Sequence, residues 1–402
     1  MIPLEDVQAE VLRSVAVLAP ASVPIADALG LVLAAPIVAT EPVPPFANTA
    51  MDGYALRAAD TSGASESEPV RLRVVADLPA GHAAAVPVGA GEAIRIMTGA
   101  PIPNGADAIV MVERTQREGD DGVLVGHAAA AGDHIRAAGG DVVAGQRVFE
   151  SGTVLGPAHV GVIASLGFES VSVIPRARVG VMSTGDELRE GPVELAPGEI
   201  RDSNRPMLLA MLRDAGCEAV NLGIARDDEA YVERALEDAL ITCHAVITSG
   251  GVSVGDYDVV KAVLDRLGVL QWWQVSIKPA KPFAFGLLRG VPLFGLPGNP
   301  VSSHVSFELF ARPALRRMMG HEALHRPEVD AIAVNAMPRR ADGKLHLDRV
   351  VVRYEDGRYL AERSGAQGSN ALAAMAVANG LALLPDGEGV EAGAPVRVML
   401  LD

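Results

Sequence analysis

The sequence AVITSGGVSVGDYDVVK, residues 245–261, decides the fold together with two stretches that follow it, SIKPAKPFAFG (276–286) and LFGLPGNPVSS (293–303). Each joins an apolar, strand-like run to a loop rich in glycine, proline or lysine. The chain has only four lysines among its 34 basic residues, and Lys261, Lys278 and Lys281 lie here. Lysine is a compact charge with three rotatable donors, whereas arginine is a planar fork. We therefore expect Lys278 and Lys281 to approach a small anion closely.

Strand-like and helix-like segments alternate around this region, from residue 176 to residue 320. This alternation predicts a mainly parallel sheet covered by helices on both faces. The expected strands are RVGVMST, EAVNLGI, AVITS, VLQWWQVSI, FAFGLL and VPLFGLP. The expected helices span residues 204–215, 228–242, 257–267 and 300–319.

Polar or glycine-rich loops follow five of these strands. In a parallel sheet, ligands bind outside the carboxyl ends of the strands. The loops should therefore converge on one cleft. They contain Thr184-Gly-Asp-Glu187, Asp227-Asp228, Ser249-Gly250-Gly251, Lys278-Pro-Ala-Lys281 and Pro297-Gly298-Asn299-Pro300.

The SGGVSVGD loop (249–256) has the composition of a phosphate cradle. Glycines allow successive N–H groups to face an anion, and the next helix adds its dipole. Asp258 is suited to cap that helix or to bind Mg²⁺ on a phosphate, and Glu187 and Asp227 project toward the same cleft. The alternatives are a plain loop and, for each carboxylate, a helix cap or a solvated charge.

Two short motifs suggest other enzymes. Gly251-Val-Ser253-Val-Gly255 fits GxSxG, but its strand ends at Ser249-Gly250, which places Ser253 on a loop and disfavours a serine hydrolase. His321-Glu-Ala-Leu-His325 fits HExxH, but Gly320 and Pro327 flank it, so a zinc site on a continuous helix is not expected.

Outside residues 176–320 the chain is mostly β-rich. Residues 4–18 predict an amphipathic helix ended by Pro20 and Pro24, and residues 66–126 predict several short strands. The segments 25–45 and 138–173 flank this β-rich insertion and should pack together. In residues 327–402, Asp356-Gly357 predicts a hairpin within a small β-barrel or sandwich.

Composition excludes several classes of protein. The net charge of −16 argues against general binding to nucleic acid or anionic membranes. Cys217 and Cys243 have no CxxC spacing and are expected to be buried in a protein of a reducing compartment. The acidic N-terminus does not resemble a signal peptide, and Leu29–Ala39 is too short to span a bilayer, so we expect a cytoplasmic protein.

Six motifs occur in one order across nearly the whole chain: PFANTAMDGYAL, RIMTGAPIPNGADAIV, STGDEL, SGGVSVGDYDVVK, IKPAKPFAFG and GLPGNPVSS. Together they resemble the molybdopterin molybdenumtransferase family, the MoeA and gephyrin E-domain proteins. Two positions depart from the family pattern. Thr49 stands where serine is common and keeps the hydroxyl, and Ala280 stands where glycine is common. The alanine predicts that a positive φ is not needed there.

The resemblance implies a multidomain chain of α/β and β-rich parts. The implied parts are an N-terminal helix (1–23) packed on the α/β domain, a discontinuous elongated domain (24–45 and 138–175), a β-rich inserted domain (46–137), a three-layer α/β domain (176–325) similar to the molybdopterin adenylyltransferases, and a C-terminal β-barrel (326–402).

The resemblance also implies an activity. Such proteins insert molybdate into adenylylated molybdopterin with Mg²⁺, release AMP, and form homodimers whose clefts involve both subunits. The molybdopterin adenylyltransferase is a further expected partner. The alternatives are an adenylyltransferase activity, which the α/β domain alone would predict, and a non-catalytic scaffold.

The functional positions carried over by resemblance fall into three groups. The expected catalytic residues are Asp52, Thr98, Arg136, Asp141, Glu187, Asp227, Asp258, Lys278 and Lys281. The expected substrate-binding residues are Ser249, Gly250, Gly251, Ser253, Pro297, Gly298, Asn299, Pro300, Arg349 and Ser369, of which Arg349 and Ser369 join the two lysines at an oxyanion site. The expected metal ligands are Glu187, Asp227 and Asp258.

Overall fold

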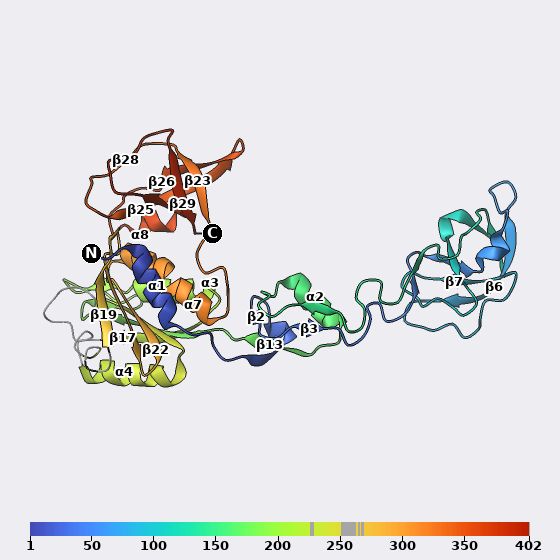
Figure 1. Ribbon diagram of the computed structural model, residues 1–402, viewed down its shortest axis with the longest axis horizontal. Helices are drawn as coiled ribbons and strands as arrows, with labels where there is room; N and C mark the ends of the chain where they lie inside the picture. Colours follow the sequence, from blue (N-terminus) through green and yellow to red (C-terminus); the bar gives the residue numbers. More distant parts are fainter. Residues whose placement is uncertain (226–228, 251–262, 264–265, 267–268, 402) are drawn as a thin grey trace. The chain divides into compact units, whose positions relative to one another are not determined.

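The computed structural model describes residues 1–225, 229–250, 263, 266 and 269–401 (Figure 1). Two compact units make up the chain. Unit 1 comprises residues 1–22, 30–34 and 172–402, and unit 2 comprises residues 23–29 and 35–171. The finer division into five segments remains a prediction.

A six-stranded sheet forms the centre of unit 1 within the described residues, in the order β17-β14-β18-β22-β21-β19. The first four strands run parallel, as the sequence predicts, and β21 is antiparallel to both of its neighbours. Strand β19 therefore points the same way as the parallel strands and ends at the same edge. The strands are β14 (Arg178–Thr184), β17 (Glu218–Ala225), β18 (Ala245–Ser249), β19 (Val269–Gln274), β21 (Pro282–Leu288) and β22 (Val291–Leu296).

Helices cover both faces of this sheet. In β14, Val179 and Val181 belong to a core shared with α1, α3 and the α6–η4–α7 segment, whereas Met182 belongs to a second core with α4. Because both faces are covered, the strand is buried from Val179 to Thr184. Figure 1 shows α1 and α7 on one side of the sheet and α4 on the other. The helices are α1 (Leu4–Ser14), α3 (Asn204–Asp214), α4 (Glu229–Thr242), α6 (Pro300–Ser306), the π-helical turn η4 (Phe307–Ala311) and α7 (Arg312–Met318).

Helix α1 ends four residues before the predicted boundary. Val15 is already extended, with φ −107° and ψ 138°, although it stays buried in the core. The N–H of Leu18 donates to the Met318 carbonyl at a distance of 2.8 Å. This contact with the end of α7 takes residues 15–18 out of the helix, so a tertiary contact overrides the helical spacing of the apolar residues.

Residues 328–400, all of which are described, close into a barrel. Its five strands run β25-β26-β23-β29-β27, and β27 pairs back to β25. Asp356 and Gly357 both have positive φ, 50° and 79°, and form the predicted hairpin between β25 and β26. The short strand β20 (Ile277–Lys278) lies between β19 and β21 in the chain and pairs with β25, so it joins the barrel to the α/β sheet. The remaining elements are β23 (Glu328–Ala333), β24 (Met337–Pro338), β25 (Leu345–Glu355), β26 (Arg358–Arg363), α8 (Leu372–Ala376), β27 (Gly380–Leu384), β28 (Gly389–Val390) and β29 (Pro395–Leu400).

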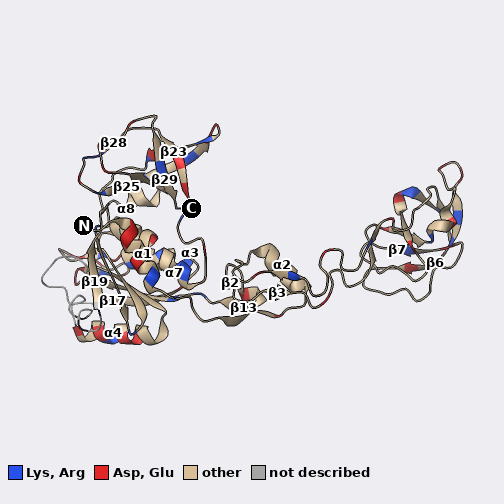
Figure 2. Ribbon diagram, in the orientation of Figure 1, with Lys and Arg blue, Asp and Glu red and all other residues tan. Residues whose placement is uncertain are grey.

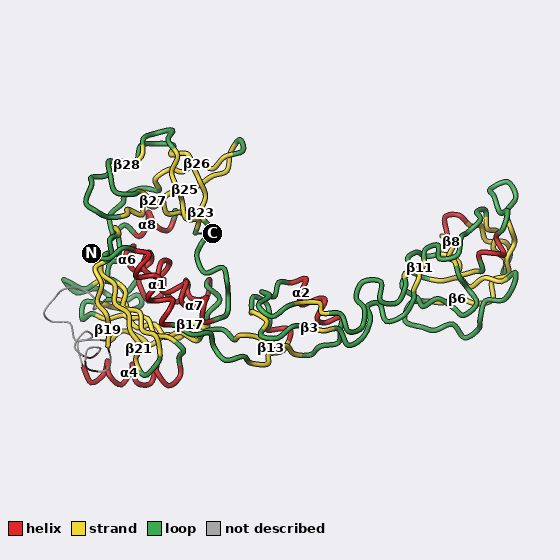
Figure 3. The backbone as a smooth tube through the Cα atoms, viewed as in Figure 1, coloured by secondary structure: helices red, strands yellow, loops and turns green. Residues whose placement is uncertain are grey.

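Unit 2, every residue of which is described, is β-rich, as Figure 3 shows by its colours. Its six-stranded sheet has the order β8-β5-β7-β6-β10-β9 and buries one apolar cluster on each face. The strands of this sheet are β5 (Gly53–Leu56), β6 (Val70–Leu78), β7 (Glu92–Ile96), β8 (Ala108–Met111), β9 (Thr115–Glu118) and β10 (Gly122–Val125).

Short elements complete the chain. They are β1 (Ala21–Pro24), η1 (Ile25–Asp27), β2 (Val32–Leu33), β3 (Ile37–Val38), β4 (Asn48–Thr49), η2 (Ala58–Thr61), η3 (Val112–Arg114), β11 (Ile135–Arg136), β12 (Arg147–Phe149), α2 (Pro157–Ser165), β13 (Ser170–Ile174), β15 (Leu188–Arg189) and β16 (Ile200–Arg201).

Charge is distributed unevenly over the helices of unit 1. Figure 2 shows acidic residues along α4 and basic residues on α7. Glu229 and Glu233 of α4 pair with Arg266, and Glu237 pairs with Arg289. Among the described residues, no helix is both long enough and apolar enough to cross a membrane.

Candidate functional site

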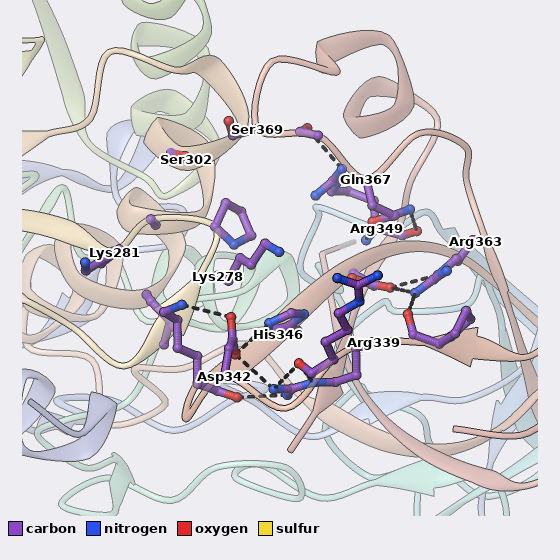
Figure 4. Close-up of a pocket in the computed structure, with 18 of the residues that line it drawn as sticks. Lys278, Lys281, Ser302, Arg339, Asp342, His346, Arg349, Arg363, Gln367 and Ser369 are labelled. Carbon is purple, nitrogen blue, oxygen red and sulfur yellow. Dashed lines mark hydrogen bonds and ion pairs between the residues drawn. The ribbon is translucent and has the colours of Figure 1, made fainter. Parts of the chain in front are cut away.

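A cavity of about 860 Å³ lies in unit 1 where the barrel meets the loop between β20 and β21 (Figure 4). Among its described lining residues are seven Lys or Arg side chains and two aspartates. Three of the four lysines of the chain, Lys278, Lys281 and Lys344, are among them. The other charged lining residues are Arg339, Arg340, Asp342, His346, Asp348, Arg349 and Arg363.

Three of these basic groups, Arg339, Lys344 and Arg363, are paired with aspartates of the barrel. Asp342 accepts hydrogen bonds from Lys344 Nζ at 2.8 Å, Arg339 at 3.1 Å and His346 Nε2 at 3.1 Å. The Lys344 hydrogen bond comes first among the causes that lower the pKa of the Asp342 carboxyl to about 2. Arg363 pairs in the same way with Asp348.

Lys278 and Lys281 differ from Lys344, Arg339 and Arg363. Both are exposed, and neither ammonium group has a hydrogen bond or ion pair with any other part of the described chain. Figure 4 shows Lys278 inside the cavity and Lys281 at the edge opposite Arg363. Unpaired cations such as these in a concave surface favour an anionic ligand.

Arg349 plays a different part from the lysines. Its side chain is fully buried, and one guanidinium nitrogen donates to the carbonyls of Ala366 at 2.9 Å and Gly368 at 3.1 Å. Burial lowers the pKa of Arg349. The arginine therefore holds the segment that leads to Ser369, which also lines the cavity.

The expectation for Ala280 is wrong. Its φ is 74°, although alanine is disfavoured there by roughly 1–2 kcal/mol. Ala280 is buried between the exposed Lys278 and Lys281 and belongs to the core below the sheet edge. Burial of this methyl group in a tight connection between β20 and β21 keeps the residue in the left-handed region.

A second cavity of about 270 Å³ lies at the carboxyl ends of β14 and β18, where the strand order reverses. Gly250 has φ 94°, and a Cβ there would lie 2.7 Å from the carbonyl oxygen of Thr184. Its N–H already donates to the Leu296 carbonyl. Gly250 thus supplies space and a backbone conformation rather than a free donor. Glu187, Ser249, Gly298 and Pro300 also line this cavity.

Asn204 joins the two loops of the second cavity, a role that sequence reasoning missed. Its Nδ2 donates to Ser249 Oγ at 2.8 Å and to the Gly298 carbonyl at 2.7 Å. The only sequence signal is a polar residue at the start of an expected helix. The first cavity adds further missed residues: Ser302, Arg339, Asp342, Lys344 and His346.

The candidate metal ligands are only partly within the described chain. Glu187 is exposed, lines the second cavity, and its carboxylate has no partner in the part of the chain that the structure describes. Such an oxygen donor suits Mg²⁺. Asp227, Asp258, Gly251 and Ser253 lie outside the described residues. Within the described residues, no cluster of three His, Cys, Asp or Glu side chains is placed to hold a metal ion.

Four candidate residues belong to unit 2. Asp52 Oδ1 accepts hydrogen bonds from the hydroxyl and the N–H of Thr98, both at 2.7 Å. These bonds hold the pKa of the Asp52 carboxyl below its usual value. Arg136 is exposed on β11, opposite Asn48 of β4. Asp141 is also exposed, and its N–H donates to the Val43 carbonyl.

The HExxH segment lies beyond the last helix of the α/β part. Helix α7 ends at Met318, so His321 and His325 do not share a helix. The motif therefore does not lie on the continuous helix that an HExxH zinc site requires.

Comparison with known proteins gives full-length matches. Three family models match in order: the MoeA N-terminal region over residues 2–167, a probable molybdopterin binding domain over 180–317, and the MoeA C-terminal region over 335–401. A molybdopterin molybdenumtransferase 2 of Mycobacterium tuberculosis is 41% identical over 391 residues, covering 95% of each chain. The molybdopterin molybdenumtransferase of Haemophilus influenzae is 36% identical and covers 92% of this chain and 91% of its own. A crystal structure of the molybdopterin biosynthesis moeA protein from Pyrococcus horikoshii matches all of both chains with a TM-score of 0.81 and 32% identity.

Proposed function

Because this chain belongs to the molybdopterin molybdenumtransferase family, we propose that it inserts molybdate into adenylylated molybdopterin and releases AMP, with Mg²⁺ as cofactor. The observation that carries the proposal is the pair of unpaired lysines, Lys278 and Lys281, in the cavity beside the barrel. A tetrahedral dianion needs local positive charge in a protein whose net charge is −16.

The two lysines bind the oxyanion and orient it. Their compact ammonium groups donate charge-assisted hydrogen bonds to its oxygens, and the Ser369 hydroxyl adds a neutral donor. Arg349 keeps the Ser369 segment in place from within the barrel. Asp342 keeps Lys344 and Arg339 occupied, which directs the anion toward the free lysines.

The pterin nucleotide occupies the second cavity at the sheet edge. Gly250 lets the loop after β18 approach Thr184 closely, and Asn204 keeps the Ser249 and Gly298 loops together. Glu187, Asp227 and Asp258 are the proposed ligands of Mg²⁺. When bound, the ion would neutralise the pyrophosphate and polarise a water molecule. No covalent nucleophile is required, since positioning and electrostatics carry the reaction.

We also propose that the protein is a homodimer and that Asp52, Thr98, Arg136 and Asp141 complete the site from the partner subunit. The molybdopterin adenylyltransferase is the proposed source of the substrate. These assignments rest on the family.

The test is molybdate-dependent release of AMP from adenylylated molybdopterin. Lys281→Ala should slow it at least about tenfold, since a charged hydrogen bond contributes roughly 1.5–3 kcal/mol. Arg289→Ala removes a positive charge from an exposed pair with Glu237 and should change the rate little. A second arm compares Asp258→Ala with the parent protein over a Mg²⁺ titration.

Full AMP release by Lys281→Ala would contradict the role of the lysines. An unchanged Mg²⁺ titration in Asp258→Ala would contradict the metal assignment. Consumption of ATP with unmodified molybdopterin would instead indicate an adenylyltransferase.

A further inference from the structure

The side-chain amide of Gln367 bonds to the backbone of Arg349. The Arg349 N–H donates to Gln367 Oε1 at 2.8 Å, and Gln367 Nε2 donates to the Arg349 carbonyl at 3.1 Å. Nε2 also donates to the Gly365 carbonyl at 3.0 Å. These partners fix the orientation of the amide, because an N–H must face an acceptor and the two carbonyls only accept.

The Arg349 side chain in turn bonds to the backbone next to Gln367. Its guanidinium donates to the carbonyls of Ala366 and Gly368, the residues on either side of Gln367. Arg349 is fully buried in the barrel. Each of the two side chains therefore holds the backbone of the other, and neither can move without breaking hydrogen bonds.

This reciprocal pair leads directly to the cavity. Gly368 precedes Ser369, and the Ser369 carbonyl accepts the N–H of Val301 at the start of α6 at 3.1 Å. The segment 366–369 is thus anchored on β25 at one end and on α6 at the other. Gln367, Ser369 and Ser302 all line the cavity that holds Lys278. Figure 4 shows Gln367 between Ser369 and Arg349.

We propose that Gln367 is a positioning residue for the oxyanion site. It acts through Arg349 and the 366–369 segment, and so sets where the Ser369 hydroxyl stands relative to Lys278. This inference rests on the proposed function, because it takes the cavity to be the oxyanion site. It assigns a role to a residue that the motifs of the family do not single out.

Gln367→Glu offers a test that depends on pH. A protonated glutamic acid has one acceptor and one donor, so it reproduces the two bonds to Arg349. The ionised form has acceptors only, and one of them faces the carbonyls of Arg349 and Gly365. The two carbonyl neighbours disfavour ionisation, and the Lys and Arg side chains of the cavity favour it. At pH 8, where the carboxylate forms, the Gln367→Glu variant should bind molybdate about tenfold more weakly than the parent protein. At pH 5.5 the two affinities should converge.

The measurements are calorimetric titration with molybdate at both pH values and steady-state kinetics. A positioning role predicts a raised KM for molybdate with less than about a threefold change in KM for the pterin nucleotide. Gln367→Ala should weaken molybdate binding at both pH values. Gln8→Glu is the matched control, because Gln8 donates to the Leu309 carbonyl away from both cavities. Melting temperatures check that each variant is folded.

The outcomes separate the two proposals. If the parent protein binds no molybdate, the proposed function fails. If the parent protein binds molybdate and Lys281→Ala weakens the binding, but folded Gln367 variants bind as tightly as the parent at both pH values, the positioning role of Gln367 is wrong. An equal rise in both KM values would also overturn it, as that indicates general damage.

Discussion

Lys278 and Lys281 keep free charges in a cavity where the barrel neutralises most neighbouring cations. Arg339 and Lys344 share Asp342, and Arg363 pairs with Asp348. An arginine at residue 278 or 281 would offer a flat fork and could reach across to these aspartates. Lysine offers a compact ammonium group that a small tetrahedral anion can approach. The rare use of lysine in this chain is therefore informative at these positions.

Cys217 gives a prediction on pH. Burial raises the pKa of its thiol to about 12, whereas the unfolded thiol ionises near 9.0. Between these values the unfolded state binds fewer protons than the folded state, so the free energy of unfolding falls as pH rises. The fall is at most about 1.4 kcal/mol per pH unit for one proton. Denaturant titrations at pH 7 and pH 10.5 should show Cys217→Ala losing less stability than the parent protein. A parallel loss in both would contradict the assignment.

At the scale of elements, the loop after β18 determines how closely β14 and β18 end together. Thr184 at the end of β14 and Gly250 after β18 nearly touch, and Asn204 of α3 bonds to both the Ser249 and the Gly298 loops. A crevice lies between the two strand ends, at the reversal of strand order. The shape of this crevice depends on residue 250 being a glycine, which has no Cβ.

Gly250→Ala should therefore raise KM for the pterin nucleotide at least about tenfold. The new Cβ would lie 2.7 Å from two Thr184 oxygens, so the loop must shift. Gly290→Ala is the matched control: its φ is also positive, 87°, but no atom lies within 4 Å of the added Cβ. Gly290→Ala should cost roughly 1–2 kcal/mol in a denaturant titration, and Gly250→Ala should cost more because the added Cβ also meets Thr184. Equal KM values for the two variants would show that the crevice does not hold the nucleotide.

At the scale of the whole molecule, the candidate residues divide between two units. Lys278, Lys281, Arg349 and Glu187 belong to unit 1, whereas Asp52, Thr98 and Arg136 belong to unit 2. Under the proposed function, a dimer would assemble each site from unit 1 of one subunit and unit 2 of the other. The division also explains why no single motif of the sequence contains all the expected chemistry.

Co-expression of two variants, each defective alone, tests this arrangement. Asp52→Ala and Lys281→Ala should each be slowed at least about tenfold alone. Co-expression should restore part of the activity, because a mixed dimer has one site with both residues intact. Lys278→Ala with Lys281→Ala is the matched control and should not recover, since both residues belong to the same cavity. Sedimentation should give twice the chain mass of 41.7 kDa. A monomer, or no recovery from a mixed dimer, would contradict the shared site.

Local rules were sufficient for much of the fold. Alternating apolar strands and helices predicted the α/β sheet, and Asp356-Gly357 predicted a hairpin that the positive φ values of both residues confirm. These features depend on residues a few positions apart, where backbone preference and hydrophobic spacing act directly. The order of the polar loops also placed Ser249, Gly250 and Gly298 at one sheet edge.

Only the tertiary structure decided which charges are free and where the connections bend. Lys344 joins Lys278 in one cavity because β20 pairs with β25, strands separated by more than sixty residues. Ala280 has a positive φ because burial at the sheet edge outweighs its local preference. The sequence by itself determined the elements and the residue types at the site. Ion pairing and burial depend on which groups the fold brings next to each side chain. The tertiary structure therefore decided which side chains are paired and which are free to bind a ligand.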